Sequence, residues 1–426
     1  MNLFKKAASN DFFRHNFIFL VGSVLVGVGN YLFYPVLSRM LEPLPFGEVQ
    51  ALTALFLQLT ILLVVMGQVT INVIANYTND KKKQEVLFEL EKLAFLLVLG
   101  VSLLLALLSP HLKSALQFQS VLPFLILLAA LVVTVPGSFR GAFLRAHKKF
   151  GAASLALLIG AYAKVVLGVL LTYLGFQVGG AMWAIFIAQL LTWFYAEYAA
   201  RKAGYQRPAK KIFSMPDIKL VLPELKYALL VLVGFGSITL LASLDVFVVR
   251  YYFDPQTAGE YAGISTVAKI IFFFTASVAQ VMFASIKLSA PTSANRKLFL
   301  RSMLLTAGLG SVALVFFTLT PDFFVRLLMG PNYASFAHYL PLLALAMLFV
   351  ALLNIAVTYY VALRMYSISI ILVTGLMLVG SLMMLHHNDL RAIIINILLG
   401  CGAIGGTIIA WRILQLSRKG QHAAIS

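Results

Sequence analysis

Long apolar segments recur along the whole chain and are separated by short polar ones. Most hold about 20 residues or more, the length at which a helix spans the hydrocarbon core of a bilayer. The pattern predicts twelve membrane-spanning helices, and therefore an all-α integral membrane protein. The predicted spans cover residues 16–38, 47–76, 87–109, 121–140, 151–174, 178–200, 222–252, 257–286, 299–320, 338–363, 366–386 and 392–413.

Lysine and arginine fall almost entirely in alternate loops between these spans. One face of the membrane receives 26 of them, the opposite face five and the spans two, which accounts for all 33. Cytoplasmic loops of membrane proteins carry such an excess of basic residues. Both termini and the loop at 201–221 are therefore predicted to be cytoplasmic. The first apolar run, 16–37, is too long for the core of a cleaved signal peptide.

Composition excludes a soluble globular protein, because 61% of the residues are hydrophobic and only 11% are charged. The net charge of +18 would suggest nucleic acid as a partner, but its distribution over alternate loops explains it without one. The single cysteine, Cys401, excludes an intrachain disulfide and a cysteine-based metal site. No metal-ligand motif or phosphate-binding loop is present, so neither a metal cofactor nor ATP hydrolysis is expected.

The chain contains a repeat with an offset of about half its length. The pattern Pro-x-x-x-Gly-Glu begins at Pro43 and again at Pro255, 212 residues later. Corresponding loops fall on the same side of the membrane, which indicates parallel repeats. We therefore expect two six-helix lobes, 1–200 and 222–426, joined by the basic linker 201–221. The linker either lies on anionic headgroups or is simply solvated. Prolines after the third and ninth spans, Pro110 and Pro321, repeat at a similar offset.

Charged residues within or beside the spans are the candidate functional residues. Lys164 and Lys269 lie near the middle of predicted spans, where a lysine needs a wet cavity or a partner. Asp245 lies about two turns inside the outer end of its span. Arg39 and Arg250 close equivalent helices of the repeat. One interpretation is a cationic cavity between the lobes that binds a phosphate-bearing headgroup; the other is a structural Lys269–Asp245 ion pair, with the arginines as interfacial anchors.

Polar side chains within the spans add a weaker set of candidates. Asn30 and Asn72 could line such a cavity, or they could hydrogen-bond neighbouring helices, as polar residues in spans often do. Only Asp245 places a carboxylate deep in a span, against two deep lysines, which favours an anionic substrate over a cationic one.

Three motifs give the chain a resemblance to a known family. They are Arg39-Met-Leu-Glu-Pro-Leu-Pro-Phe-Gly-Glu48, the segment Gly259-Glu-Tyr-Ala262 that follows Asp245, and Leu328-Met-Gly-Pro-Asn-Tyr333 in the long outer loop. The ordered set resembles the Wzx-type flippases of O-antigen and other polysaccharides, in the multidrug/oligosaccharidyl-lipid/polysaccharide (MOP) exporter superfamily.

The resemblance implies a fold like that of the multidrug (MATE) exporters, with two six-helix lobes around a central cavity. It implies a flippase that moves an undecaprenyl diphosphate-linked oligosaccharide, a unit of O-antigen, capsule or exopolysaccharide, across the bacterial inner membrane by alternating access. Coupling to an H⁺ or Na⁺ gradient or to the membrane potential is also implied. Expected partners are membrane lipids and the polysaccharide polymerase with its chain-length machinery.

Two other functions fit the sequence less well. A multidrug or cation antiporter of the same superfamily would need more buried carboxylates. A membrane polysaccharide polymerase or glycosyltransferase would need catalytic acids and bases in a large outer loop, and the longest outer loop offers only Asp322, Arg326 and, at its edge, His338. We therefore expect a transporter and not an enzyme.

Overall fold

The structure, a computed structural model, describes residues 11–76, 80–206, 216–286 and 291–425. These residues form helices and no strand, which confirms the predicted all-α class. Nine helical segments within them are long and apolar enough to cross a membrane, or ten if the bent pair α9–α10 is one span. The chain is therefore a multi-pass membrane protein, and the predicted total of twelve spans stays a prediction.

The count falls below twelve partly because two helices are continuous with one another. The stretch Phe150–Lys202 counts once, yet it contains α7 (Phe150–Leu171) and α8 (Gln177–Lys202), which pack against each other. Between them, η1 (Thr172–Phe176) holds Gly175 at φ +90°. Only glycine adopts such a φ at little cost, so Gly175 lets the chain turn within a few residues.

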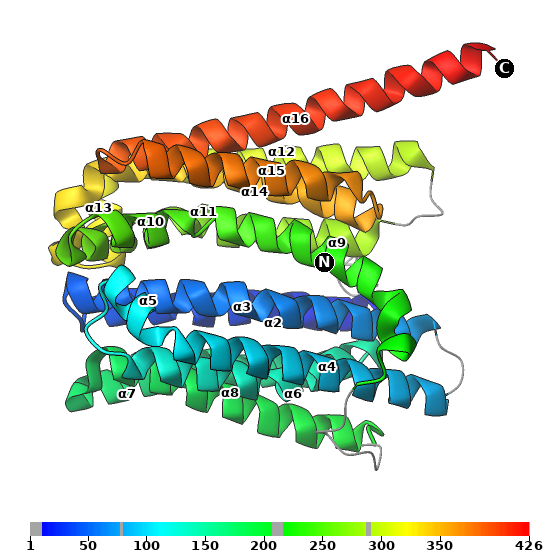
Figure 1. Cartoon of the computed structure of the whole chain (residues 1–426), viewed down its shortest axis with the longest axis horizontal. Coiled ribbons are helices and arrows are strands. Elements are labelled where there is room, and N and C mark those ends of the chain that lie inside the picture. The colour runs from blue at the N-terminus through cyan, green and yellow to red at the C-terminus, as the bar shows by residue number, and fades with distance from the viewer. Residues whose placement is uncertain (1–10, 77–79, 207–215, 287–290, 426) are drawn as a thin grey trace, which may run out of the picture. The chain divides into compact units, whose positions relative to one another are not determined.

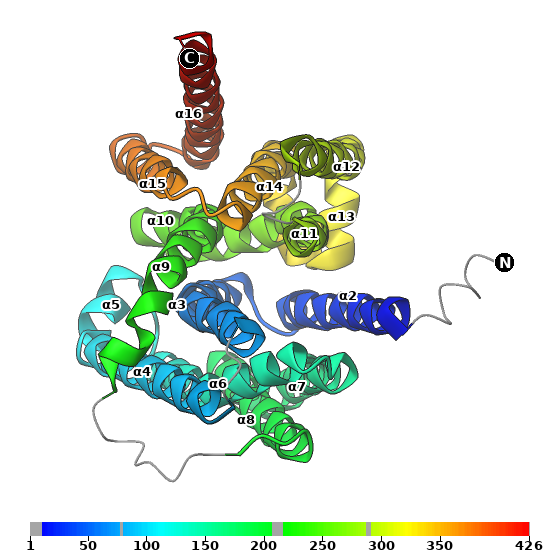
Figure 2. The ribbon, with the colours of Figure 1, turned by 90° about the vertical axis from the view of Figure 1, so that its right-hand side faces the viewer.

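Contacts divide the chain into two units, Met1–Leu229 and Leu230–Ser426. In the first, α6 is the central helix and packs against α3, α4 and α8, while α2 packs along α7 (Figures 1 and 2). The helices of this unit, besides α7, η1 and α8, are α2 (Asp11–Ser38), α3 (Pro43–Asn76), α4 (Asp80–Leu107), α5 (Ser109–Ala115) and α6 (Leu122–Ala146).

In the second unit α14 is the central helix, and it packs against α11, α12 and α16. The helix α9 begins before the boundary and enters this unit at residue 230. The helices are α9 (Ile218–Leu241), α10 (Leu244–Tyr252), α11 (Pro255–Ser285), α12 (Thr292–Leu319), α13 (Pro321–Leu328), η2 (Pro331–Tyr339), α14 (Leu340–Ala362), α15 (Ser367–Leu385) and α16 (Leu390–Ile425). Part of the predicted linker, 207–215, lies outside the described residues, and the division into six-helix lobes stays a prediction.

The repeated Pro-x-x-x-Gly-Glu motif has the same local role in both units. Both α3 and α11 begin at its proline, which suits the first turn of a helix because that position needs no N–H donor. In α3 the carboxylate of Glu48 accepts a hydrogen bond from the backbone N–H of Gln119, at 2.7 Å, in the loop after α5. In α11 the carboxylate of Glu260 accepts one from the Ser335 hydroxyl, at 2.6 Å, after α13. Each glutamate thus ties its helix to the segment that follows the short helix of its unit.

The start of α11 has an additional cap. Oδ1 of Asp254 accepts hydrogen bonds from the backbone N–H groups of Gln256, at 3.1 Å, and Thr257, at 3.0 Å. The Thr257 hydroxyl, together with these backbone bonds, favours the ionised carboxylate and holds the pKa of Asp254 below its ordinary value. The cap fixes the point at which the chain turns from α10 into α11.

The Leu-Met-Gly-Pro-Asn-Tyr motif, which joins α13 to η2, ends in a buried packing contact. Tyr333 is fully buried, and its ring lies so close to Gly263 of α11 that a Cβ atom there would meet ring carbons Cδ1 and Cε1. Gly330, at φ +102°, lets the chain turn just before η2. The motif therefore anchors the segment between α13 and α14 onto α11.

Replacing Gly263 by alanine is expected to destabilise the protein by about 1–3 kcal/mol, because the buried Tyr333 ring has little room to move. Thermal unfolding of purified protein in detergent would measure the loss. Gly308→Ala in α12 is the matched control, since nothing lies within 4 Å of a Cβ at that exposed position. Equal melting temperatures for the two variants would contradict the proposed contact.

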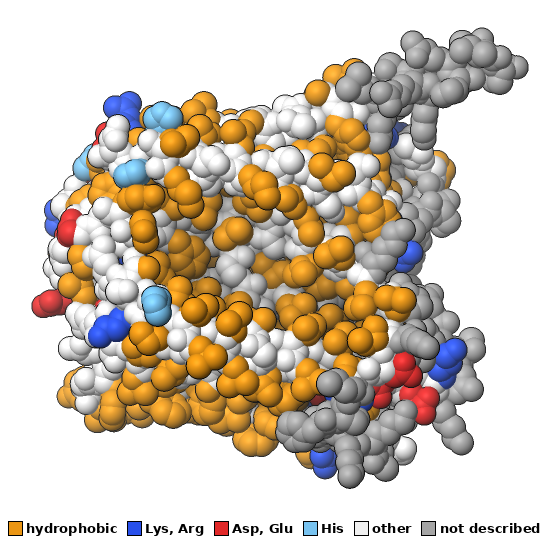
Figure 3. Space-filling model, in the orientation of Figure 1, with side chains coloured by type: hydrophobic (Ala, Val, Ile, Leu, Met, Phe, Trp, Pro, Cys, Tyr) orange, Lys and Arg blue, Asp and Glu red, His pale blue; other side chains and the backbone are white. Residues whose placement is uncertain are grey.

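The exposed surface of the long helices is apolar. Large hydrophobic side chains such as Val166, Leu304 and Ile370 are more than 60% exposed. Figure 3 shows hydrophobic side chains along the helices and charged or histidine side chains gathered toward their ends. A surface of this kind suits a hydrocarbon environment and not water.

Candidate functional site

The structure brings four of the predicted site residues together in two pairs, one in each unit. In the first unit Lys164 of α7 meets Asn30 of α2. In the second unit Asp245 of α10 meets Lys269 of α11. The two pairs differ in whether the lysine charge is neutralised, and that difference decides what each can bind.

The first pair is formed where α2 and α7 approach closely. A Cβ on Gly29 would lie 3.1 Å from Ala161 and from the ring of Tyr162, so small residues permit the approach. Nζ of Lys164 donates a hydrogen bond of 2.9 Å to Oδ1 of Asn30 and lies 4.8 Å from the centre of the Phe33 ring. The neighbouring helix thus offers the lysine an amide oxygen and an aromatic face.

Both of these contacts of Lys164 are electrically neutral. An amide oxygen and an aromatic ring attract an ammonium group, but neither supplies a negative charge to neutralise it. The lysine is half-buried and Asn30 is exposed on the surface of the unit. The pair can therefore bind an anion without first breaking an ion pair.

The second pair depends on a break in the helix. The axes of α9 and α10 bend by 49° around Ala242 and Ser243, and Asp245 lies in the first turn of α10. A carboxylate is favoured there by the unpaired N–H groups and the helix dipole. The side chain of Asp245 is fully buried, so it needs partners from the neighbouring helix.

One face of α11 supplies those partners at a spacing of four residues. Oδ2 of Asp245 accepts hydrogen bonds from the hydroxyls of Tyr261, at 3.1 Å, and Ser265, at 2.7 Å. Oδ1 lies 3.5 Å from Nζ of Lys269, which is only 7% exposed. Residues four apart share a helix face, so the three side chains form one stripe along the carboxylate. The structure thus forms the Lys269–Asp245 ion pair that the sequence offered as one of two interpretations.

The other predicted arginines, Arg39 and Arg250, differ from each other in burial. Arg39, just beyond the end of α2, is exposed, whereas Arg250 in the last turn of α10 is 1% exposed. The two arginines at equivalent ends of the repeat therefore have different surroundings, and Arg250 is too buried to be an exposed interfacial anchor. The side chain of Asn72 lies outside the part of the structure that is described.

The sequence analysis missed a third cluster of charges, in the first unit. Arg140 of α6, 2% exposed, binds Glu91 of α4 through Nη1, at 2.7 Å, and Glu197 of α8 through Nε, at 2.6 Å. Its guanidinium also lies 4.1 Å from the centre of the Tyr205 ring. Arg140 is the last residue of the predicted span 121–140, and it is counted in the sequence analysis among the basic residues of the cytoplasmic face. The signal for a buried partner is the presence of Glu91 and Glu197 within the predicted spans 87–109 and 178–200.

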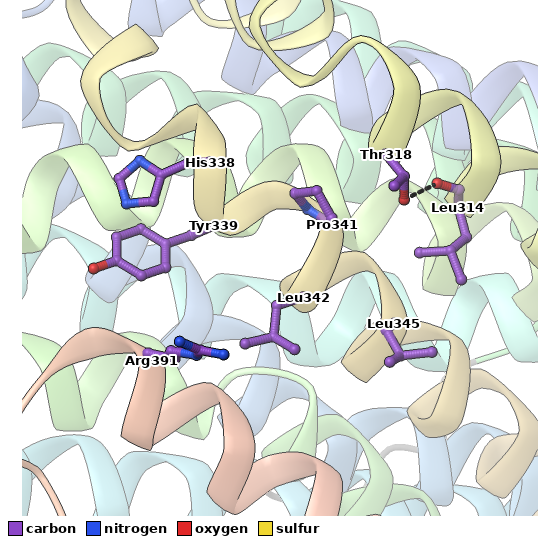
Figure 4. Close-up of a pocket in the computed structure, with 8 residues that line it drawn as sticks. All are labelled: Leu314, Thr318, His338, Tyr339, Pro341, Leu342, Leu345 and Arg391. Atoms are coloured by element: carbon purple, nitrogen blue, oxygen red, sulfur yellow. Dashed lines mark hydrogen bonds between the residues drawn. The ribbon is translucent and has the colours of Figure 1, made fainter.

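A pocket of about 460 Å³ lies in the second unit, at the end of α12 and the start of α14 and α16 (Figure 4). Figure 4 shows His338, Tyr339 and Arg391 to one side of the leucine side chains that complete the lining. The rings of His338 and Tyr339 are 4.1 Å apart, and Nδ1 of His338 is 3.1 Å from the carbonyl oxygen of Ser335. The residues that line it are Leu314, Thr318, His338, Tyr339, Pro341, Leu342, Leu345 and Arg391.

Solved transporter structures share this fold. An inward-facing multidrug resistance MATE family transporter of the MOP superfamily matches with a TM-score of 0.71 and 14% identity, over 94% of this chain and 99% of that one. The lipid II flippase MurJ, in an inward closed conformation, matches with a TM-score of 0.68 and 14% identity, over 92% and 87%. A MOP superfamily transporter from Pyrococcus furiosus matches with a TM-score of 0.61 and 15% identity, over 95% of both chains.

Sequence comparison assigns the family. Among curated proteins, none matches the chain. The family model described as "Polysaccharide biosynthesis protein" matches residues 13–287, well over half of the chain. The match and the fold agree with the predicted resemblance to polysaccharide transporters of the MOP superfamily. The chain belongs to the polysaccharide biosynthesis protein family.

Proposed function

We propose that the chain is a flippase that moves an undecaprenyl diphosphate-linked oligosaccharide across the bacterial inner membrane. Its family is one of polysaccharide biosynthesis, and a structure of the same fold is a lipid II flippase. The observation that carries the proposal is the cation at Lys164, whose hydrogen bond and ring contact are both with neutral groups. A diphosphate headgroup is the complementary charge.

The depth of Lys164 supports a role in transport. It lies 14 residues after the start of α7, which is ~21 Å along the helix axis. A lysine near the centre of a span costs roughly 2.5–3.5 kcal/mol in lipid even on the most lenient scale. The cost falls if the side chain faces a wet pathway or an anion, so we place Lys164 on the path of the substrate headgroup, with Asn30 as the group that orients it.

The buried Asp245 cluster is the proposed site of coupling. Its carboxylate is held by two hydroxyls and Lys269 and lies at a helix break. Protonation of the carboxylate, or binding of Na⁺ by it, would weaken the 3.5 Å contact with Lys269. A gradient of H⁺ or Na⁺ could thereby change the balance between conformations, as alternating access requires.

A cation antiporter is the second candidate, because a buried carboxylate can bind a cationic substrate. Here, however, Lys269 already neutralises that carboxylate. Proteoliposomes that contain the purified protein separate the two proposals. A flippase is expected to move fluorescent diphosphate-linked oligosaccharide between leaflets and to leave an organic cation gradient unchanged. Cation exchange without lipid movement would overturn the flippase proposal.

The predicted topology can be tested with the same protein. The only cysteine, Cys401, is 1% exposed. Labelling of a variant therefore comes from the added cysteine and not from Cys401. Arg145→Cys and Lys297→Cys are expected to resist a membrane-impermeant thiol reagent applied to intact cells, while Arg391→Cys reacts. The cysteines at positions 145 and 297 become reactive in inverted vesicles if the positive-inside orientation is right. Labelling of Lys297→Cys from outside intact cells would contradict the predicted topology. Lys81 and Lys211, also predicted to be cytoplasmic, have side chains outside the described residues.

A further inference from the structure

A second cavity lies in the first unit, between α4, α6 and α8, around the Arg140 cluster. Its volume is about 590 Å³, within the range of roughly 300–1,000 Å³ that small-molecule sites occupy. Neither the Lys164–Asn30 pair nor the Asp245–Lys269 pair contributes to it. The lining residues are Phe88, Glu91, Lys92, Phe95, Pro136, Arg140, Trp193, Phe194, Glu197, Tyr198 and Arg201.

Charges of both signs line this cavity in near balance. Lys92, Arg140 and Arg201 contribute three cations, and Glu91 and Glu197 contribute two carboxylates. Lys92 is in turn bound to Glu89, at 2.7 Å. A cavity so balanced has little net attraction for an anion, but it can hold a ligand that carries one positive and one negative group.

Some polar atoms of the cavity have hydrogen-bonding capacity to spare. Glu91 lines the cavity, and it is Oε2 of its carboxylate that binds Arg140, so the second oxygen, Oε1, is not used by that bond. Arg201 binds Glu197 through Nε, at 2.7 Å, and its side chain is 69% exposed. This bond does not use the two terminal nitrogens of the guanidinium group. The indole N–H of Trp193 is buried and has no hydrogen-bond partner in the described structure. A carboxylate oxygen, a guanidinium edge and an indole N–H thus all remain to be satisfied.

Aromatic rings form the apolar part of the lining and its edge. Phe88, Phe95 and Trp193 line the interior, and their faces can attract an ammonium group. Phe194 and Tyr198 are 61% and 63% exposed on the outer surface of α8. Because α8 is part of a membrane-spanning segment, the cavity borders lipid and lies near the level of the headgroups, close to the end of the helix at Lys202.

We propose that this cavity binds the headgroup of a zwitterionic bilayer phospholipid with a primary ammonium, such as phosphatidylethanolamine. The ammonium donates to Oε1 of Glu91 within the aromatic lining, and the phosphate accepts from the terminal nitrogens of Arg201 and the indole N–H of Trp193. The acyl chains leave past Phe194 and Tyr198 into the bilayer. Because Lys92 is paired with Glu89, the other charges of the lining balance and give an anionic lipid no net attraction. A choline headgroup has no N–H to donate to Glu91.

Trp193 provides a direct probe, since it is one of three tryptophans in the chain. In the full-length Trp183→Phe/Trp411→Phe protein, its fluorescence is measured in detergent micelles with phospholipids that carry brominated acyl chains. Phosphatidylethanolamine is expected to quench at roughly tenfold lower mole fraction than phosphatidylcholine or phosphatidylglycerol, the size of one charge-assisted hydrogen bond. Equal quenching by all three lipids, or preference for the anionic one, would overturn the proposal.

Two variants assign the headgroup contacts. Glu91→Gln is expected to abolish the preference for ethanolamine over choline. Arg201→Gln is expected to weaken the binding of both lipids equally, and it leaves the two Arg140 bonds intact. Glu85→Gln, an equal loss of charge at an exposed position of α4, is the control and should change nothing. Retained preference in folded Glu91→Gln protein sinks the assignment; if that variant does not fold, the lipid comparison and Arg201→Gln still decide.

Discussion

Replacing Lys164 by glutamine is expected to lower lipid-linked oligosaccharide transport roughly 10- to 100-fold at matched expression, the effect of losing a charged hydrogen bond of about 1.5–3 kcal/mol. Glutamine keeps a donor for Oδ1 of Asn30, the present acceptor of the lysine at 2.9 Å. The variant therefore removes the charge and leaves the contact between α2 and α7 in place. Reconstituted flipping of a fluorescent diphosphate-linked substrate measures the loss.

Two further variants make this result specific to the charge at that position. Lys164→Arg keeps the cation and is expected to retain a substantial part of the transport. Lys297→Gln removes an equal charge from an exposed position of α12 and should leave transport unchanged. Transport at the wild-type rate in Lys164→Gln, with normal folding, would show that the lysine is not on the substrate path.

Much of the fold follows from the sequence because it depends on local patterns. Apolar segments of bilayer length predict helices directly, and the repeated proline motif marks the starts of α3 and α11. The apolar pattern also separates the spans 151–174 and 178–200, which correspond to α7 and α8. It does not show that helical structure continues between them through the turn at Gly175.

The candidate site is predicted less completely, because its contacts join distant segments. The Asp245–Lys269 pair was foreseeable, since both residues lie in consecutive predicted spans. The Lys164–Asn30 contact joins residues 134 positions apart, and no spacing rule connects them. Arg140 lies near the end of its span, where a basic residue normally indicates topology. Only the packing of α4, α6 and α8 reveals it as the centre of an ionic cluster.

Removing Lys269 is expected to destabilise the protein by about 3–5 kcal/mol, the usual cost of leaving a buried charge without its partner. In Lys269→Ala the carboxylate of Asp245 stays fully buried and keeps only its two hydroxyl donors. The double variant Asp245→Asn/Lys269→Ala removes both charges, and most of the stability should return. Thermal unfolding in detergent, followed by loss of the monodisperse peak in size-exclusion chromatography, compares the two.

Transport by the same two variants separates a structural role of Lys269 from a role in substrate binding. The sequence-based prediction is that Lys269 helps to hold the diphosphate, in addition to its ion pair with Asp245. On that prediction the double variant regains stability and stays inactive in the flipping assay, because it lacks both the cation and the carboxylate proposed for coupling, so the decisive outcome is a recovery of transport. Asp245→Glu, which keeps both charges of the ion pair, serves as the control for coupling and should retain measurable transport. If the double variant recovers transport along with stability, Lys269 acts only as the counter-charge of Asp245, and Lys164 is then the cation on which substrate binding depends.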